Sequence, residues 1–132
     1  MRFPEDWPND CPPPDAEEAS GDVYRIVRND PPAAADFATH WETGRLPKAP
    51  PCLRRGLSVF HDVRDARHQR ALFPKLGHLI ARATLASDHG LTKLTHGSQP
   101  THTTWWACEG VHRASLFAVV EEESRPCGSC KA

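Results

Sequence analysis

The chain has 132 residues, with 16 Lys and Arg, 17 Asp and Glu and 8 His, and a formal net charge of −1. This length fits one domain around one hydrophobic core and excludes two independent cores. Hydrophobic residues make up 39% of the chain, and no stretch is apolar for long enough to cross a membrane. We therefore expect a protein without a membrane span, located in the cytoplasm.

The N-terminal segment is rich in proline and acid. Residues 1–20 hold five prolines and six acidic residues against one base, Arg2. Because proline has no backbone N–H and the segment has little apolar surface to bury, we predict a disordered arm over residues 1–21. The segment also lacks the apolar run of roughly 7–15 residues that a secretory signal contains. We expect one globular domain over residues 22–121 and a flexible tail over 122–132.

Charge is distributed unevenly along the chain. Residues 23–120 carry 13 Lys and Arg against 7 Asp and Glu, together with all eight histidines. A body of this sign attracts an anion, which could be a nucleotide cofactor, nucleic acid or the protein's own tail. The alternative is an ordinary solvated basic surface. We expect a dinucleotide or another anionic small molecule rather than nucleic acid or a membrane.

The five cysteines do not form an even set, and their spacing does not fit a secreted disulfide scaffold. Cys127 and Cys130 form a CxxC pair, but a structural zinc site needs four ligands, and the sequence has no second CxxC and no HxxxH. We predict no metal site, and the CxxC pair can be either a reactive tail or half of a metal site.

The first elements read as a strand and a helix. Residues 22–29 (DVYRIVRN) alternate with the two-residue period of a strand, and Arg25 shares one face with two valines. Residues 33–43 have a helical composition with apolar side chains on one face. Gly44 is placed to end that helix.

A second strand and helix follow a proline-rich connection. Residues 56–60 (GLSVF) form a short apolar strand. Asp62 stands where an N-cap belongs, and the helix that it opens extends to about residue 73.

The last third of the domain is dominated by alternating runs. Residues 78–86 and 91–96 alternate and are separated by a turn, so we predict a hairpin. Residues 97–110 read as a polar loop, and 116–120 as a final strand. The order β, α, β, α, β, β, β predicts a small single domain of the α+β class, with a mostly antiparallel or split sheet and two helices.

Two strand residues are candidates for chemistry. If Arg25 faces inward, it needs an anionic or carbonyl partner, because burying an unpaired charge is very costly. A bound phosphate or carboxylate would serve, and the alternative is an arginine whose charged end reaches solvent. Ser58 places a hydroxyl in an apolar strand. It either contacts a ribose or amide of a ligand or bonds to neighbouring backbone.

The predicted loop over 97–110 gathers hydroxyls, an imidazole and two tryptophans. Thr103 and Trp105 could bind the edge and face of a flat ring, and His102 could act as a general base near neutral pH. The alternative is that the tryptophans fill the core and the threonines cap the loop.

Taken together, the VYR strand, the helix with DF and a terminal Gly, and the GLSVF strand resemble the small ADP-ribosyltransferase fold, including the bacterial RES-domain toxins that consume NAD. The resemblance covers about residues 22–120 and implies an enzyme with NAD as its substrate. It implies that Arg25 holds the cofactor and that Ser58 and Phe60 lie against nicotinamide. The predicted catalytic residues are Arg25, Ser58 and His102. The predicted cofactor-binding residues are Tyr24, Arg25, Gly56, Ser58, Phe60, Thr103 and Trp105.

The sequence departs from the family at the acid that polarises the ribose. The helix after GLSVF has no Glu, and Glu109 is the only acid in residues 97–110. The sequence supports two predictions of function. The first is an NAD-binding ADP-ribosyltransferase-like domain, acting as an NAD-consuming toxin or transferase or as an inactive member. The second is a non-enzymatic domain that binds a protein, such as an immunity or antitoxin-like partner.

Overall fold

The computed structural model describes residues 1–95 and 97–123, so Cys127, Cys130 and most of the predicted tail lie outside the described residues. The strands are β1 (Glu17–Glu18), β2 (Gly21–Val27), β3 (Leu57–Phe60), β4 (Leu79–Leu85), β5 (Gly90–Leu94), β6 (His102–Ala107) and β7 (Ala118–Glu122). The helices are α1 (His40–Thr43), α2 (Pro51–Arg54) and α3 (Val63–Leu72). Short 3-10 turns span Ala34–Phe37, Pro74–Leu76, Ser87–His89 and Arg113–Leu116.

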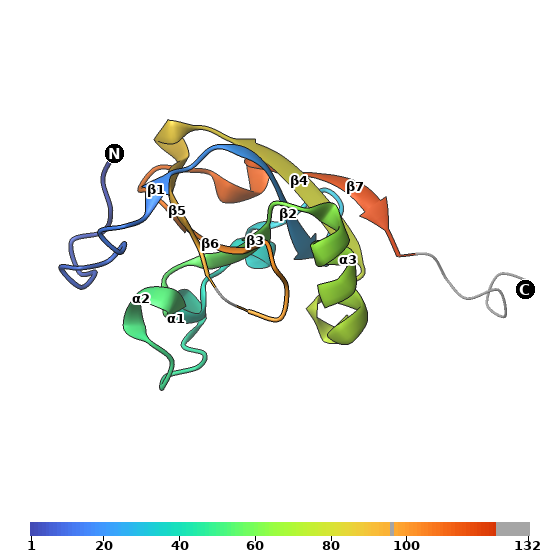
Figure 1. Ribbon diagram of the computed structural model, residues 1–132, viewed down its shortest axis with the longest axis horizontal. Coiled ribbons are helices and arrows are strands. Elements are labelled where there is room, and N and C mark those ends of the chain that lie inside the picture. Colours follow the sequence, from blue (N-terminus) through green and yellow to red (C-terminus); the bar gives the residue numbers. More distant parts are fainter. Residues whose placement is uncertain (96, 124–132) are drawn as a thin grey trace, which may run out of the picture.

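Within the described residues, the seven strands form one antiparallel sheet in the order β1-β5-β6-β3-β2-β4-β7 (Figure 1). Strand β2 pairs with β4 along its whole length. In contrast, β2 and β3 pair only at Tyr24 and Phe60. The sheet is therefore almost divided between β2 and β3, and α3 packs beside these two strands. The predicted α+β class and mostly antiparallel sheet are confirmed.

Two predicted connections are wrong. The runs 78–86 and 91–96 form β4 and β5, but β4 pairs with β2 and β7, while β5 pairs with β1 and β6. The stretch 97–110, predicted as a loop, contains β6. All of β6 except its first residue is buried. A strand covered on both faces need not alternate between apolar and polar residues, so the periodicity that reveals other strands is absent here.

The helix predicted over 33–43 is divided into a 3-10 turn and α1. Thr39 is the N-cap of α1: its hydroxyl accepts from Glu42 N at 3.1 Å, and the Glu42 carboxylate accepts from Thr39 N at 2.8 Å. This reciprocal capping box starts a new helix inside the predicted one. Gly44 ends α1 with a φ of 69°, as predicted. Asp62 caps α3 by accepting from Arg64 N, also as predicted.

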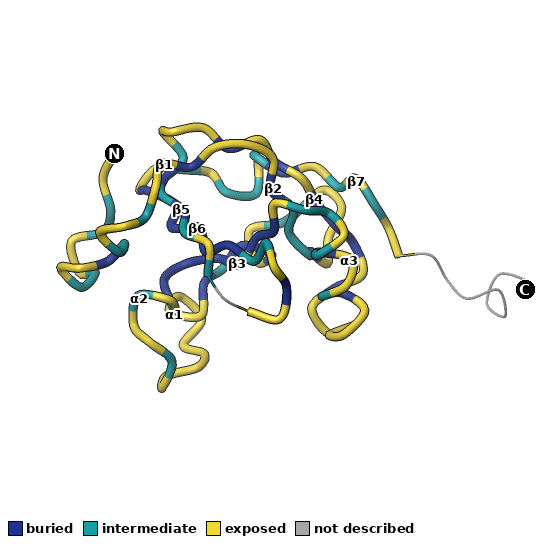
Figure 2. The backbone as a smooth tube through the Cα atoms, viewed as in Figure 1, coloured by how far each residue is buried: buried dark blue, intermediate teal, exposed yellow. Residues whose placement is uncertain are grey.

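The main core contains large side chains from both halves of the sheet. Trp105 is fully buried, its ring centroid lies 5.9 Å from that of Phe117, and its Nε1 donates to the His89 carbonyl at 3.0 Å. Phe37, only 1% exposed, contacts Phe117 from the 3-10 turn before α1. Figure 2 shows buried residues along the central strands and mostly exposed ones around α1 and α2.

The N-terminal segment differs from the disordered arm that the sequence predicted. A disulfide joins Cys11 to Cys52, a pairing that the sequence analysis did not predict. Strand β1 pairs with β5, Ala19 is 1% exposed, and the Asp15 carboxylate lies 2.9 Å from the Lys93 ammonium. The covalent bond and the strand pairing provide the anchoring that the composition of the segment alone does not. Among the described residues, no helix has the length and apolar character needed to cross a membrane.

Candidate functional site

A pocket with a volume of about 680 Å³ opens where β2 and β3 separate. It is bounded by the end of β2, the segment that carries α1, the connection through α2, and strands β3 and β6. Arg25, Ser58 and His102, the three residues predicted as catalytic, all line it, and so do Gly56 and Phe60. The volume falls within the range of small-molecule and cofactor sites, about 300–1,000 Å³.

Arg25 bridges the gap between the separating strands. Its Nε donates to the Asp36 carbonyl at 2.9 Å and its Nη1 to the Ser58 carbonyl at 2.7 Å. Past the Tyr24–Phe60 pair, β2 and β3 no longer pair, so the guanidinium satisfies the Ser58 carbonyl that the ladder leaves open, together with the Asp36 carbonyl of the neighbouring 3-10 turn. These two carbonyls are the partners that an inward-facing arginine requires.

The charge of Arg25 persists despite its enclosure. Burial lowers the pKa of its guanidinium to about 10, the charge of Asp36 opposes this shift, and the charge of Arg113 adds to it. The group is therefore still cationic at neutral pH. None of the described residues accepts a hydrogen bond from its Nη2, which leaves donors available on the pocket side.

A chain of polar contacts runs across the pocket from β3 to β6. The Ser58 hydroxyl lies 2.9 Å from His102 Nε2. His102 Nδ1 lies 2.9 Å from Thr95 Oγ1 and 3.1 Å from the Thr95 carbonyl. Thr95 Oγ1 in turn lies 2.8 Å from Thr104 Oγ1. The imidazole is thus fixed at both nitrogens with its Nε2 edge toward the serine.

The only acidic residue that lines the pocket within the described ranges is Asp36. Its carboxylate accepts hydrogen bonds from the backbone N–H groups of Arg28 (2.8 Å) and Ala33 (2.9 Å) and from the Asn29 amide (3.1 Å). Burial acts to raise the pKa of Asp36, but these hydrogen bonds and the Arg25 charge lower it overall. The carboxylate is therefore ionised and engaged in holding the turn.

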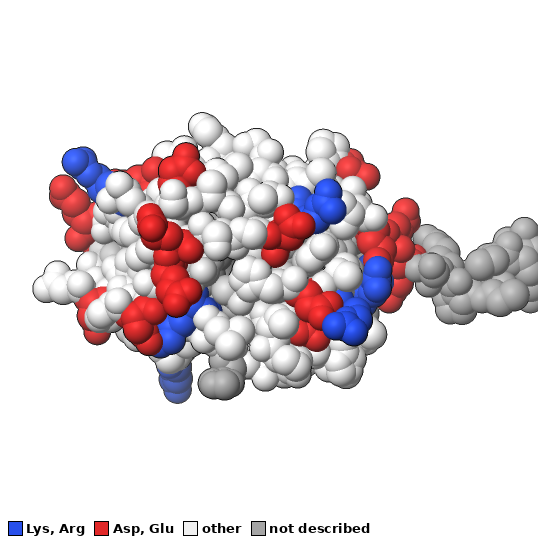
Figure 3. Space-filling view, turned by 45° about the horizontal axis from the view of Figure 1, so that its top comes forward, with Lys and Arg blue, Asp and Glu red and all other residues white. Residues whose placement is uncertain are grey.

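Besides Arg25 and Asp36, the charged residues of the described pocket wall are all basic, and they lie among apolar side chains. Arg28, Arg45 and Arg54 line it together with His40. Burial is the main cause that lowers the pKa of His40, followed by the positive charges of Arg45, Arg25 and Arg54. The positive charges of Arg45, Arg25 and Arg54, rather than the burial of His40, are the part of this environment that attracts an anion. On the face of the molecule shown in Figure 3, by contrast, acidic and basic side chains lie in small mixed groups.

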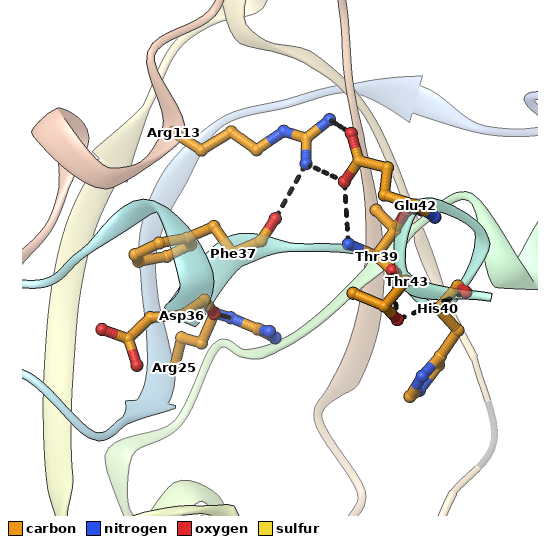
Figure 4. A network of polar contacts seen from close by, with 8 residues as sticks. All are labelled: Arg25, Asp36, Phe37, Thr39, His40, Glu42, Thr43 and Arg113. Atoms are coloured by element: carbon orange, nitrogen blue, oxygen red, sulfur yellow. Dashed lines mark hydrogen bonds and ion pairs between the residues drawn. The ribbon is translucent and has the colours of Figure 1, made fainter. Parts of the chain in front are cut away.

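A salt bridge fixes the segment that presents His40. Arg113 donates to the Phe37 carbonyl at 2.8 Å and to both oxygens of the Glu42 carboxylate, at 2.7 and 3.2 Å. In Figure 4, Arg113 and Glu42 lie above this segment, while the side chains of Arg25 and His40 extend below it. The bidentate pair therefore holds the segment from the side away from the pocket residues.

The floor of the pocket requires a glycine. A Cβ at Gly56 would lie 2.3 Å from Thr104 Cγ2 and 3.2 Å from Trp106 Nε1. Because a contact under 3.0 Å displaces the neighbour, any side chain here would push against β6. Gly56 therefore shapes the pocket that it was predicted to line.

Three predicted cofactor-binding residues lie elsewhere. Thr103 and Trp105 are buried in the core, because alternation along β6 turns them away from the face that carries His102 and Thr104. Tyr24 packs with the second apolar cluster beside Phe60 and does not line the pocket. Recognising β6 as a strand would have shown that Thr103 and Thr104 lie on opposite faces.

Sequence reasoning also missed the short segment around α1 as a pocket wall. Asp36, Thr39 and His40 come from this segment, whose helical composition gave no sign of function. Glu109, the one acid of the predicted loop, lines a different pocket of about 350 Å³ beside the N-terminal segment.

Across residues 1–95 and 97–123, no group of three or more His, Cys, Asp or Glu side chains is arranged to hold a metal ion. Comparison with family models, with curated proteins and with solved structures found no match. The pocket itself, with its arginines and its serine–histidine contact, is therefore the basis for a functional assignment.

Proposed function

We propose that this chain binds NAD, or a closely related anionic dinucleotide, in the pocket between β2 and β3, as an ADP-ribosyltransferase-like protein. The observation that carries the proposal is that Arg25, Ser58 and His102, chosen from sequence for this role, line one pocket. Had the arginine and the serine faced opposite sides of the sheet, the proposal would have had no site.

The charge of the pocket supports a phosphate-bearing ligand. Arg25 keeps unused donors on its guanidinium, and planar guanidinium groups match phosphate oxygens in geometry. Arg28, Arg45 and Arg54 add positive charge along the same wall. We assign the pyrophosphate or the adjacent ribose to Arg25.

The apolar part of the pocket suits the flat rings of such a ligand. Phe60 and Gly56 line the floor with Ser58 between them, and Leu46, Leu53 and Leu76 reach the pocket with roughly half of each side chain exposed. We assign nicotinamide to the region of Ser58 and Phe60. A flat ring there would contact one aromatic face and one hydroxyl.

Binding and turnover are tested together by adding NAD to the purified protein. A ligand at 100 times its Kd stabilises the folded state by about 2.7 kcal/mol, which thermal unfolding detects. We expect a rise in Tm that saturates with NAD concentration, and nicotinamide release if the chain is an enzyme. The absence of both effects would contradict the proposal.

Variants at Arg25 make the test specific. Arg25→Lys keeps the charge but loses the planar donor group, so we expect NAD affinity to fall by about tenfold or more while the protein still folds. Arg82→Ala removes an exposed arginine from β4, outside the pocket wall, and serves as the matched control. Equal losses in the two variants would indicate a general charge effect rather than a site.

The non-enzymatic alternative, a domain that binds a partner protein, stays a prediction. One observation favours it: the leucines at the pocket wall and the neighbouring Trp41, which is 41% exposed, leave apolar surface uncovered. A stable complex with a copurified protein, together with no change in Tm on adding NAD, would favour this reading over the first.

A further inference from the structure

We propose that Ser58 and His102 form a nucleophile–base pair, and that Ser58 itself accepts the ADP-ribosyl group of the bound dinucleotide. This inference rests on the proposed function, because it names what happens to NAD in the same pocket. It begins with the 2.9 Å contact between Ser58 Oγ and His102 Nε2, which has the geometry of an activated hydroxyl.

The partners of His102 fix which nitrogen carries its proton. The Thr95 carbonyl, 3.1 Å from Nδ1, can only accept a hydrogen bond and so favours the tautomer with the hydrogen on Nδ1, which the Thr95 hydroxyl 2.9 Å away can accept as well. Nε2 then presents a lone pair, and the Ser58 hydroxyl donates to it. Thr95 thus orients the imidazole as a base, the position that a carboxylate occupies in a Ser–His–Asp triad.

Ser58 is also held from its other side. Its carbonyl accepts from Arg25 at 2.7 Å, and its backbone is paired with Thr104 on β6. The hydroxyl lines the pocket next to the cation that we assign to the phosphates or ribose. A dinucleotide bound by Arg25 would therefore bring its nicotinamide ribose close to Ser58.

The pocket offers few other groups that could start the reaction. Asp36 is the sole acid lining it within the described residues, and both carboxylate oxygens already accept hydrogen bonds. A water molecule would lack a carboxylate to activate or orient it. Ser58 needs none, because its base is already in contact with it.

The step balances without a further reactant. Ser58 Oγ attacks C1′ of the nicotinamide ribose, and a C1′–O bond forms while the C1′–N bond breaks. The electron pair of that bond passes to the ring nitrogen, which loses its positive charge, and nicotinamide leaves as a neutral molecule. The Ser58 proton passes to His102 Nε2 and from there to solvent. The product is ADP-ribosyl-Ser58 and one nicotinamide.

The experiment measures the mass of the full chain after incubation with NAD. We expect a gain of one ADP-ribosyl group, which peptide fragmentation places on Ser58, and one released nicotinamide per chain. Ser58→Ala should lose the adduct but keep the NAD-dependent rise in Tm. Ser115→Ala, which removes an exposed serine on the 3-10 turn before β7, should form the adduct at the unaltered rate.

A second variant separates chemistry from folding. His102→Gln removes the base but keeps a hydrogen-bonding side chain, and we expect adduct formation to slow by about 100-fold with NAD binding retained. Binding of NAD without an adduct, an adduct on another residue, or nicotinamide release at an unchanged rate in Ser58→Ala would each overturn this inference and leave the proposed function standing. No binding at all would overturn both.

Discussion

Neighbouring residues of β2 meet very different surroundings. At Val23 the strand is fully buried and forms part of the main core, and at Tyr24 it pairs with Phe60 of β3. At Arg25 the ladder with β3 ends, and a side chain takes over the bonding to the Ser58 carbonyl. Apolar burial stabilises the strand at Val23, whereas at Arg25 the link to β3 is made by a polar group that can also serve a ligand.

The largest effect on stability should come from a substitution in the main core. Trp105→Ala removes a fully buried ring and its hydrogen bond to His89, so we expect a loss of about 3–5 kcal/mol in the free energy of unfolding, measured in urea. Trp41→Ala, which removes a ring of the same type that is 41% exposed, is the control. A smaller loss for Trp105 than for Trp41 would contradict the description of the core.

The disulfide should contribute next. It closes a loop over a sequence separation of 41 residues, and a bridge of this span stabilises a fold by about 2–4 kcal/mol. We expect the double substitution of Cys11 and Cys52 by Ser to lower the free energy of unfolding by that amount. Reductant should destabilise the wild type to a similar extent and leave the double variant unchanged; a reductant effect on both would point away from this bond.

A smaller loss in the free energy of unfolding is expected at Arg25, where β2 and β3 separate. Arg25→Ala leaves the carbonyls of Ser58 and Asp36 without their donor, which costs about 1–3 kcal/mol in the free energy of unfolding. Arg82→Ala should change it by less than about 0.5 kcal/mol, because Arg82 is exposed. Added NAD cannot restore the missing bonds, so the loss should persist with ligand present.

The smallest effect concerns pH. The pKa of His40 is lowered in the folded state, so below about pH 6.5 the unfolded chain binds more protons and stability falls as pH decreases. His40→Gln should flatten that part of the stability profile, whereas His112→Gln, at an exposed site, provides the control. Pyrophosphate bound near His40 should raise its pKa, observable by NMR titration. An unchanged titration with bound pyrophosphate would argue against an anion in this pocket.

The sequence predicted those parts of the site that depend on local periodicity. Alternation put Arg25 on the same face as two valines, and the rule against unpaired buried charge predicted an anionic or carbonyl partner if it faced inward; the structure shows two carbonyls. The cap at Asp62 follows from a single residue and its neighbours.

The rest depends on contacts between distant segments. β6 is buried on both faces and shows no period, so the choice between Thr103 and Thr104 could not be made without its pairing to β3. The bond between Cys11 and Cys52 joins the N-terminal segment, which was predicted to be disordered, to the proline-rich connection before β3. The local sequence of neither segment indicates that the two lie in contact.

That bond has a consequence for the pocket. Cys52 lies in α2 directly before Leu53 and Arg54, which line the pocket, and its carbonyl accepts from Trp106 Nε1 at 2.9 Å. Through Cys11, the disulfide ties this part of the pocket wall to the N-terminal segment. Thiols in the cytosol are kept reduced, whereas an oxidising compartment preserves such a bond. The redox conditions around the protein would then determine whether this wall is held by both the disulfide and the Trp106 hydrogen bond or by the hydrogen bond alone. This difference would change how freely a ligand enters and leaves the pocket.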